Sequence, residues 1–126
     1  KCYIAKQTNS PFVIWGSGEE EREFMFANDF AEILQKMHTQ NDLPQNIIVS
    51  DEKNYKISDI VNTIVDIFKF TGNIIYTKDK GAGVFKKPTS NTIFRQHFPN
   101  FKFTELRQGL ETTIEYFINN LDKVKL

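Results

Sequence analysis

A tryptophan and an arginine lie at the two ends of one short glycine turn. In "FVIWGSGEEEREFMF", residues 12–26, Trp15 precedes Gly-Ser-Gly, and Arg22 follows three glutamates. A guanidinium fork matches phosphate or carboxylate in bidentate geometry, and an indole ring can stack on another ring. Two alternatives remain open: Arg22 pairs with a neighbouring glutamate, and Trp15 is a core aromatic at a strand end. The three glutamates are expected to be solvated turn surface.

A second candidate for anion binding is the polar segment "KDKGAGVFKK". It places four lysines around two glycines, at Lys78, Lys80, Lys86 and Lys87. Flexible backbone together with ammonium groups can cradle phosphate. The alternative is a solvated surface loop that is merely rich in lysine.

Catalytic patterns are missing from this sequence. It has no glycine-rich nucleotide loop, no His/Cys cluster with metal-ligand spacing and no Ser/His/Asp or Tyr-x-x-x-Lys arrangement. His38 and His97 favour solvated or capping roles. The single cysteine, Cys2, cannot form an internal disulfide, and a nucleophilic role for it is disfavoured. We therefore predict no catalytic residue, no metal site and no cofactor-binding residue within these residues.

The elements that must position these side chains follow from hydrophobic periodicity. A helix end is expected at 1–7, and the 28–38 segment reads as an amphipathic helix capped by Asn28 or Asp29. Ser58 and Thr104 are expected to cap two further helices, the first of which stops at Gly72. Strands are predicted at 12–15, 23–26, 46–50 and 73–77, and a short helix at 91–97.

The alternation of strand and helix predicts an α/β layer structure. Parallel pairing is expected between the strands around residues 47 and 75. We expect one compact unit over residues 1–126, because no linker-like segment or repeat interrupts it.

Composition and charge limit the kinds of binding partner that we expect. The 126 residues carry 16 basic and 16 acidic side chains, so no global field attracts nucleic acid or an anionic membrane. No apolar run approaches the roughly 18 to 20 residues of a membrane helix, and the first residues lack a signal-peptide core. A cytoplasmic location is the expectation. The start "KCYIAK" has the texture of a helix end, which suggests a piece of a longer chain.

Several motifs in order give the sequence a family resemblance. "VIWGSGEEEREFMF" and "NDFAEIL" are followed by "GAGVFKKPTSNTIF", "FPNFKFTEL" and "GLETTIEYF". Together they resemble the C-terminal part of the GDP-L-fucose synthases, which are extended short-chain dehydrogenase/reductases. The resemblance covers essentially the whole chain.

The resemblance implies a function for the full-length protein. It would convert GDP-4-keto-6-deoxy-D-mannose to GDP-L-fucose by 3,5-epimerisation and 4-reduction, with NADP(H) bound by an N-terminal Rossmann domain that is not covered here. The covered part would be the small α/β substrate-binding subdomain, inactive alone. A homodimer is implied for the full-length enzyme, and self-association is expected for the isolated piece because apolar surface is exposed.

The resemblance also assigns binding residues. Trp15 matches a tryptophan that contacts the substrate, Arg22 an arginine at the diphosphate, and Lys87 a basic residue there. Lys1 lies about where another substrate-contacting cation is found. Ala82 replaces an aspartate of some bacterial members, which leaves the nucleotide preference open.

Two other functions remain as alternatives. One is another extended nucleotide-sugar epimerase, dehydratase or reductase, and the other is a non-catalytic nucleotide-binding module.

Overall fold

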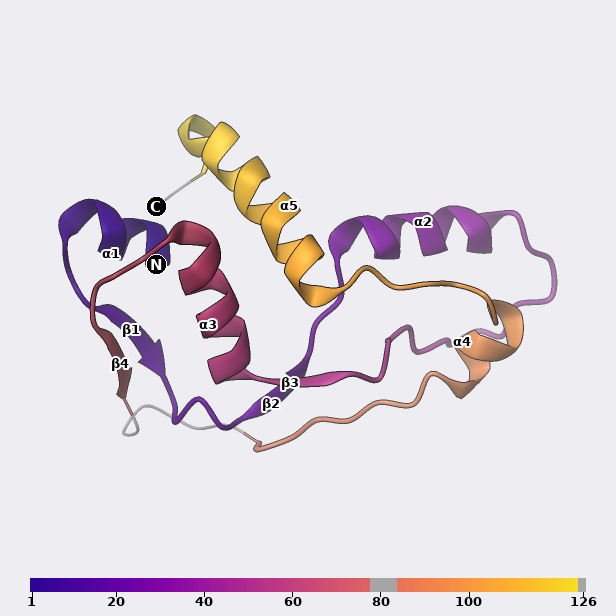
Figure 1. Ribbon diagram of the computed structural model, residues 1–126. Coiled ribbons are helices and arrows are strands. Elements are labelled where there is room, and N and C mark those ends of the chain that lie inside the picture. Colours follow the sequence, from indigo (N-terminus) through magenta and orange to yellow (C-terminus); the bar gives the residue numbers. More distant parts are fainter. Residues whose placement is uncertain (78–83, 125–126) are drawn as a thin grey trace. The chain divides into compact units, whose positions relative to one another are not determined.

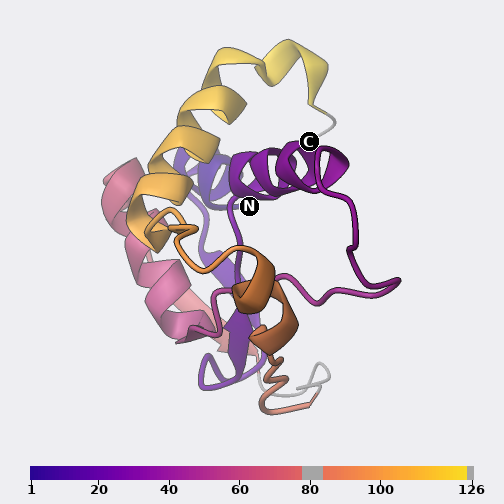
Figure 2. The same cartoon turned by 90° about the vertical axis from the view of Figure 1, so that its right-hand side faces the viewer.

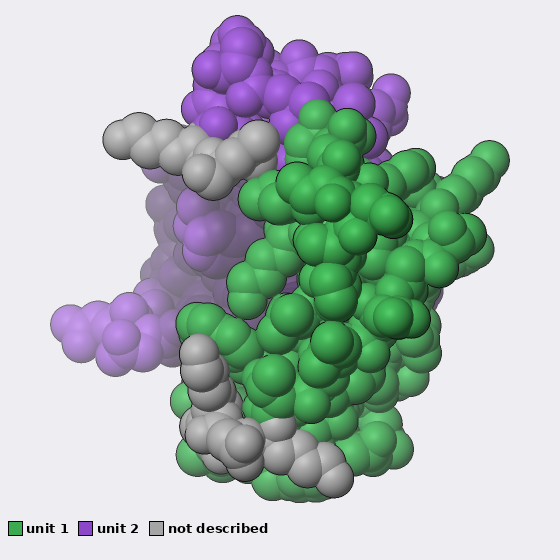
Figure 3. Space-filling view, turned by 90° about the vertical axis from the view of Figure 1, so that its left-hand side faces the viewer, with its two compact units in different colours: residues 1–23, 54–88 green, residues 24–53, 89–126 purple. Residues whose placement is uncertain are grey.

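The computed structural model of the protein describes residues 1–77 and 84–124. Its helices and strands confirm the predicted α/β class (Figure 1). The sequence indicated one compact unit, whereas the residues group into two: unit 1 comprises 1–23 and 54–88, and unit 2 comprises 24–53 and 89–126 (Figure 3). Each unit has a hydrophobic core of its own.

The described residues of unit 1 form two helices and four short strands. Its elements are α1 (Cys2–Thr8), β1 (Phe12–Trp15), β2 (Glu21–Glu23), β3 (Asn54–Lys56), α3 (Ile57–Phe68) and β4 (Ile74–Thr77). The period of two along β1 buries Phe12 and Ile14 and exposes Val13 and Trp15. The buried pair packs with residues of α1 and α3 and with Phe70.

Strand β4, predicted at 73–77, is present, but its predicted partner is wrong. β4 pairs in parallel with β1, and Phe12 lies opposite Ile74. Residues 39–53 form no helix or strand (Figures 1 and 2), so the predicted strand at 46–50 is absent. Ile47 and Val49 pack on the core of unit 2, but neither of the described sheets includes their backbone. The side-chain amide of Asn91 donates to the backbone carbonyl of Ser50 at 2.8 Å, where a neighbouring strand would otherwise donate.

The second predicted strand is displaced along the chain. Residues 21–23 form β2, which pairs antiparallel with β3, a strand that the sequence did not reveal. Residues 24–26 of the predicted strand instead lead into α2 (Ala27–His38), for which Phe26 is the N-cap. The predicted helix at 28–38 is therefore confirmed, with its start one residue earlier.

Unit 2 is built from helices around a phenylalanine cluster. Besides α2, it contains α4 (Thr92–His97), α5 (Leu106–Asn119) and the short 3-10 helix η1 (Leu121–Lys123). Ile33 and Phe94 are fully buried in its core. Phe94 stacks on Phe98, with ring centroids 5.2 Å apart.

The predicted side-chain caps of the helices are wrong. No side-chain cap hydrogen bond occurs at the start of α2, α3 or α5. Instead, Asp29 accepts bonds from Thr104, at 2.8 Å from its backbone N–H and 2.7 Å from its hydroxyl, and so ties the starts of α2 and α5 together. α3 ends at Phe68 with Lys69 in a left-handed conformation, ahead of the predicted stop at Gly72.

Candidate functional site

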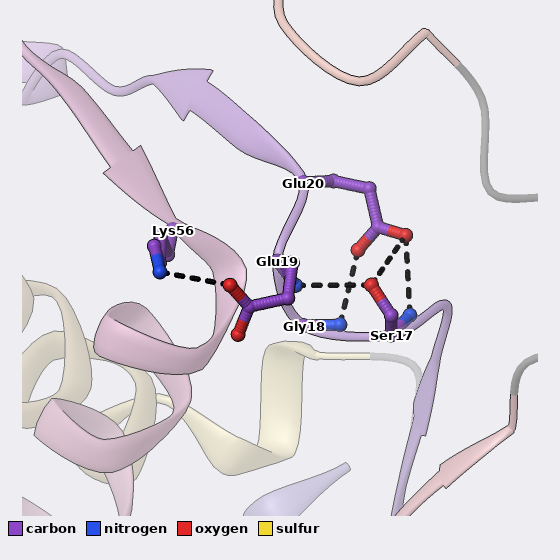
Figure 4. Close-up of polar contacts among 5 residues, drawn as sticks. All are labelled: Ser17, Gly18, Glu19, Glu20 and Lys56. Carbon is purple, nitrogen blue, oxygen red and sulfur yellow. Dashed lines mark hydrogen bonds and ion pairs between the residues drawn. The ribbon is translucent and has the colours of Figure 1, made fainter.

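The glycine turn between Trp15 and Arg22 is folded around a buried carboxylate (Figure 4). Glu20 accepts bonds from the backbone N–H of Ser17 at 3.1 Å, the Ser17 hydroxyl at 3.1 Å and the N–H of Gly18 at 3.0 Å. Only 7% of Glu20 is exposed, so its expected role as solvated surface is wrong. The Ser17 N–H, foremost among these donors, holds the pKa of Glu20 below its ordinary value of 4.5.

The same turn caps α3 with its backbone. The N–H of Ser58 donates to the carbonyl of Gly18 at 2.9 Å, and the N–H of Ile57 donates to the carbonyl of Glu20 at 3.0 Å. These two bonds satisfy donors at the helix start that have no partner within the helix. Ser58 therefore lies inside the helix and receives a cap instead of providing one.

An ion pair adds to this attachment. Glu19 lies 2.8 Å from Lys56, the N-cap residue of α3 (Figure 4). The hydrogen bond from Lys56 to Glu19 raises the pKa of Lys56, and the negative charge of Glu19 is the second cause. Both side chains are about half exposed, so the pair contributes little to the free energy of unfolding.

Gly18 is required by both backbone conformation and space. Its φ of +86° is unfavourable for residues with a side chain, and an added Cβ would lie 2.6 Å from Cε1 of Tyr76. Tyr76 packs against the core of unit 1, and burial raises its pKa, with the charge of Glu19 as a second cause. The turn is thus seated against β4.

We expect Gly18→Ala to lower the free energy of unfolding by about 1 to 3 kcal/mol, because it adds backbone strain and a clash with Tyr76. Gly109→Ala is the matched control. Gly109 lies in α5, where a Cβ would make an ordinary contact 3.4 Å from Phe26 and would favour the helix. Thermal unfolding of both variants checks the prediction, and equal midpoints would contradict it.

Arg22 joins β2 to the segment that carries the lysines. Its Nη1 donates to the carbonyl of Glu21 at 2.6 Å and to that of Phe85 at 3.2 Å. The N–H of Glu21 also donates to Phe85, at 2.8 Å, and the carboxylate of Glu21 pairs with Lys86 at 2.7 Å. The carboxylates of Glu19, Glu20 and Glu21 thus have partners other than Arg22.

Trp15 is 62% exposed, so the core-packing alternative for it is wrong. The Lys1 ammonium lies over its ring, 4.3 Å from the centroid. This distance is within the range of a cation–π contact. The structure therefore brings two of the predicted site residues together on the exposed side of β1.

Lys87 is exposed and follows Lys86 directly. Arg22 and Lys87 are thereby on adjoining segments, because Phe85 is bonded to Arg22. Lys78, Lys80 and Ala82 lie outside the described residues.

In the part of the chain that the structure describes, Cys2 and the two histidines lie on three separate helices. Cys2 is 4% exposed, and burial raises the pKa of its thiol, which disfavours the nucleophilic thiolate. His38 and His97 occupy the last turns of α2 and α4, where a cation is favourable. Over residues 1–77 and 84–124, no group of three or more His, Cys, Asp or Glu side chains is arranged to hold a metal ion. In the same ranges, no helix is long and apolar enough to cross a membrane.

Comparison with known proteins identifies the fold. The NAD dependent epimerase/dehydratase family matches residues 2–50. A GDP-L-fucose synthetase from Naegleria fowleri superposes with a TM-score of 0.90 and 34% identity, over 100% of this chain and 39% of that chain. The GDP-L-colitose synthase of Yersinia pseudotuberculosis is 35% identical over 84% of this chain and 34% of its own length. The GDP-L-fucose synthase of Dictyostelium discoideum is 26% identical over 99% of this chain and 40% of its own length.

The chain thus has the α/β fold of part of an extended short-chain dehydrogenase/reductase. It spans about 34 to 40% of the length of these relatives. Within that class it is a relative of the GDP-L-fucose synthases and matches one part of those longer proteins, which confirms the resemblance inferred from the motifs.

The structural role of Glu20 was not predicted from the sequence. The signal available was a carboxylate two residues beyond a glycine and three beyond a serine, close enough to bond back to their N–H groups.

Proposed function

We propose that the full-length protein is an NADP-dependent GDP-L-fucose synthase that converts GDP-4-keto-6-deoxy-D-mannose to GDP-L-fucose by 3,5-epimerisation and 4-reduction. Residues 1–126 form its nucleotide-sugar-binding part. The likeness to the Naegleria fowleri GDP-L-fucose synthetase, at 34% identity over 100% of this chain and 39% of that chain, supports this proposal. The homodimer that the resemblance implies stays a prediction.

One observation carries the binding role. An exposed indole ring and a guanidinium lie at the two ends of a turn that is locked by Glu20 and by the start of α3. A ring and a cation at fixed ends suit a ligand that itself joins a ring system to a phosphate group. A nucleoside diphosphate has this composition.

Each side chain has a distinct task in the proposed complex. Nη1 of Arg22 holds two carbonyls, and we assign the opposite edge of the guanidinium, Nε and Nη2, to the diphosphate. Lys87 supplies a second cation from the adjoining segment. Trp15 offers an apolar surface to the substrate, with Lys1 over its ring. These residues bind and orient the substrate and transfer no proton.

The cofactor belongs to another part of the proposed enzyme. A related structure from Naegleria fowleri holds NADP. The present sequence has no glycine-rich dinucleotide-binding motif, so none of its residues is assigned to the cofactor. NADPH would supply the hydride for the reduction at C4.

Calorimetric titration of the full-length protein with GDP, UDP and dTDP tests the proposal. We expect GDP to bind most tightly. Tighter binding of UDP would overturn the assignment. Because one relative is a GDP-L-colitose synthase, incubation with the proposed substrate and NADPH, followed by product analysis, must also yield GDP-L-fucose.

A further inference from the structure

The turn at 16–20 contains an anion-binding arrangement that is filled from within the chain. Successive backbone N–H groups at Ser17 and Gly18 point at one site, as they do in the nests that bind phosphate or carboxylate. Here the anion is the Glu20 carboxylate, which also accepts the Ser17 hydroxyl. Gly16 makes room for it: a Cβ there would lie 3.0 Å from both carboxylate oxygens.

The buried carboxylate determines where the ends of the turn lie. It fixes the turn from inside, while the carbonyls of Gly18 and Glu20 fix it to α3. Trp15 directly precedes the turn, and Arg22 is the second residue after it. A change in the turn therefore alters the spacing between the ring and the guanidinium.

We propose that Glu20 is a positioning residue for the nucleotide diphosphate site, because its carboxylate holds the turn that sets the separation of Trp15 and Arg22. The inference rests on the proposed function and adds a residue to it. Glu20 itself touches no ligand and acts through the two residues that do.

The role requires a carboxylate and not merely a side chain of this size. Both oxygens are used, Oε1 by Ser17 and Oε2 by Gly18. In Glu20→Gln an amide NH₂ replaces one oxygen, so two donors face each other and one buried N–H loses its acceptor. Glu19→Gln is the matched control. It removes the same charge at the neighbouring residue, whose carboxylate, among the described residues, takes part only in an exposed ion pair and in no bond within the turn.

Binding of GDP-mannose by the full-length protein at pH 7.5 gives the first measurement. Its diphosphate diester keeps its charge down to low pH, so the charge of the group that Arg22 would bind does not change as the pH falls. We expect Glu20→Gln to weaken binding about tenfold and Glu19→Gln less than about twofold. Amide exchange should be faster at Ser17 and Gly18 in Glu20→Gln only.

A pH profile separates positioning from general destabilisation. Because the pKa of Glu20 is lowered, its carboxylate stays ionised somewhat below pH 4.5. As the pH falls further, the carboxylate is protonated and its negative charge is lost. The tenfold advantage of wild type over Glu20→Gln should thus shrink towards one as the pH falls through that range. The charged or titratable groups around the turn are common to both proteins: Glu19, Glu21, Lys56, Asp59, Tyr76 and Lys86.

The outcomes are distinguishable. If wild type binds GDP-mannose and Glu20→Gln binds equally well, Glu20 does not position the site. A ratio that stays constant with pH also overturns the proposal, even if Glu20→Gln folds poorly. If wild type does not bind GDP-mannose at all, the proposed function fails, and amide exchange alone then decides whether Glu20 holds the turn.

Discussion

Phe94→Ala is expected to lower the free energy of unfolding of unit 2 by about 3 to 5 kcal/mol. Phe94 has no exposed surface and lies within 5.2 to 6.0 Å, centroid to centroid, of the rings of Phe98, Phe101 and Phe103. Truncation removes the aromatic contacts together with the buried area and leaves a cavity that the other rings cannot fill. Urea unfolding followed by circular dichroism should show a midpoint lower by about 2 M.

Ile93→Ala is the control for this change. Ile93 precedes Phe94 in the same helix but is 45% exposed, so its truncation should cost less than about 1 kcal/mol. Equal losses in the two variants would contradict the core that the structure describes. Phe94→Leu should lie between them, because it keeps most of the apolar volume.

Arg22→Ala is expected to weaken GDP binding about 30- to 150-fold, equivalent to about 2 to 3 kcal/mol. The substitution removes the guanidinium proposed to bind the diphosphate. It also releases the carbonyl of Phe85 from the Nη1 bond, which loosens the segment that carries Lys87. Arg22→Lys should recover only part of the loss, because an ammonium keeps the charge but lacks the planar fork.

Calorimetry with Lys86→Ala provides the comparison for Arg22→Ala. Lys86 is a cation of the same surface whose ammonium is paired with Glu21, so its removal should change the affinity less than about threefold. Unchanged GDP binding in Arg22→Ala would exclude Arg22 from the diphosphate site.

The helices were predictable because their apolar residues recur with a helical period. All five α-helices that the sequence predicted are present. The strands were harder: "NIIVS" has strand composition, but Ile47 and Val49 pack against helices and no ladder forms. β3 was not predicted because "NYK" is too short and too polar to show an alternation of apolar and polar residues. The strand forms through its pairing with β2.

Within the candidate site, residue type was informative and local geometry was not. Trp15 and Arg22 are singled out by chemistry and position. That Trp15 is exposed depends on which face of β1 packs on the core, which a four-residue strand does not reveal by itself. The burial of Glu20 follows from a backbone turn with two glycines at positive φ, and hydropathy ranks glutamate as surface.

The bonds from the turn to α3 limit how this loop can be altered in engineering. Adding or deleting one residue between Gly16 and Glu20 would shift the carbonyls of Gly18 and Glu20 away from the N–H groups of Ser58 and Ile57. A loop taken from a related enzyme would therefore have to be transplanted together with the first turn of the helix. The two segments lie some 40 positions apart in the chain, but they must be replaced as one unit.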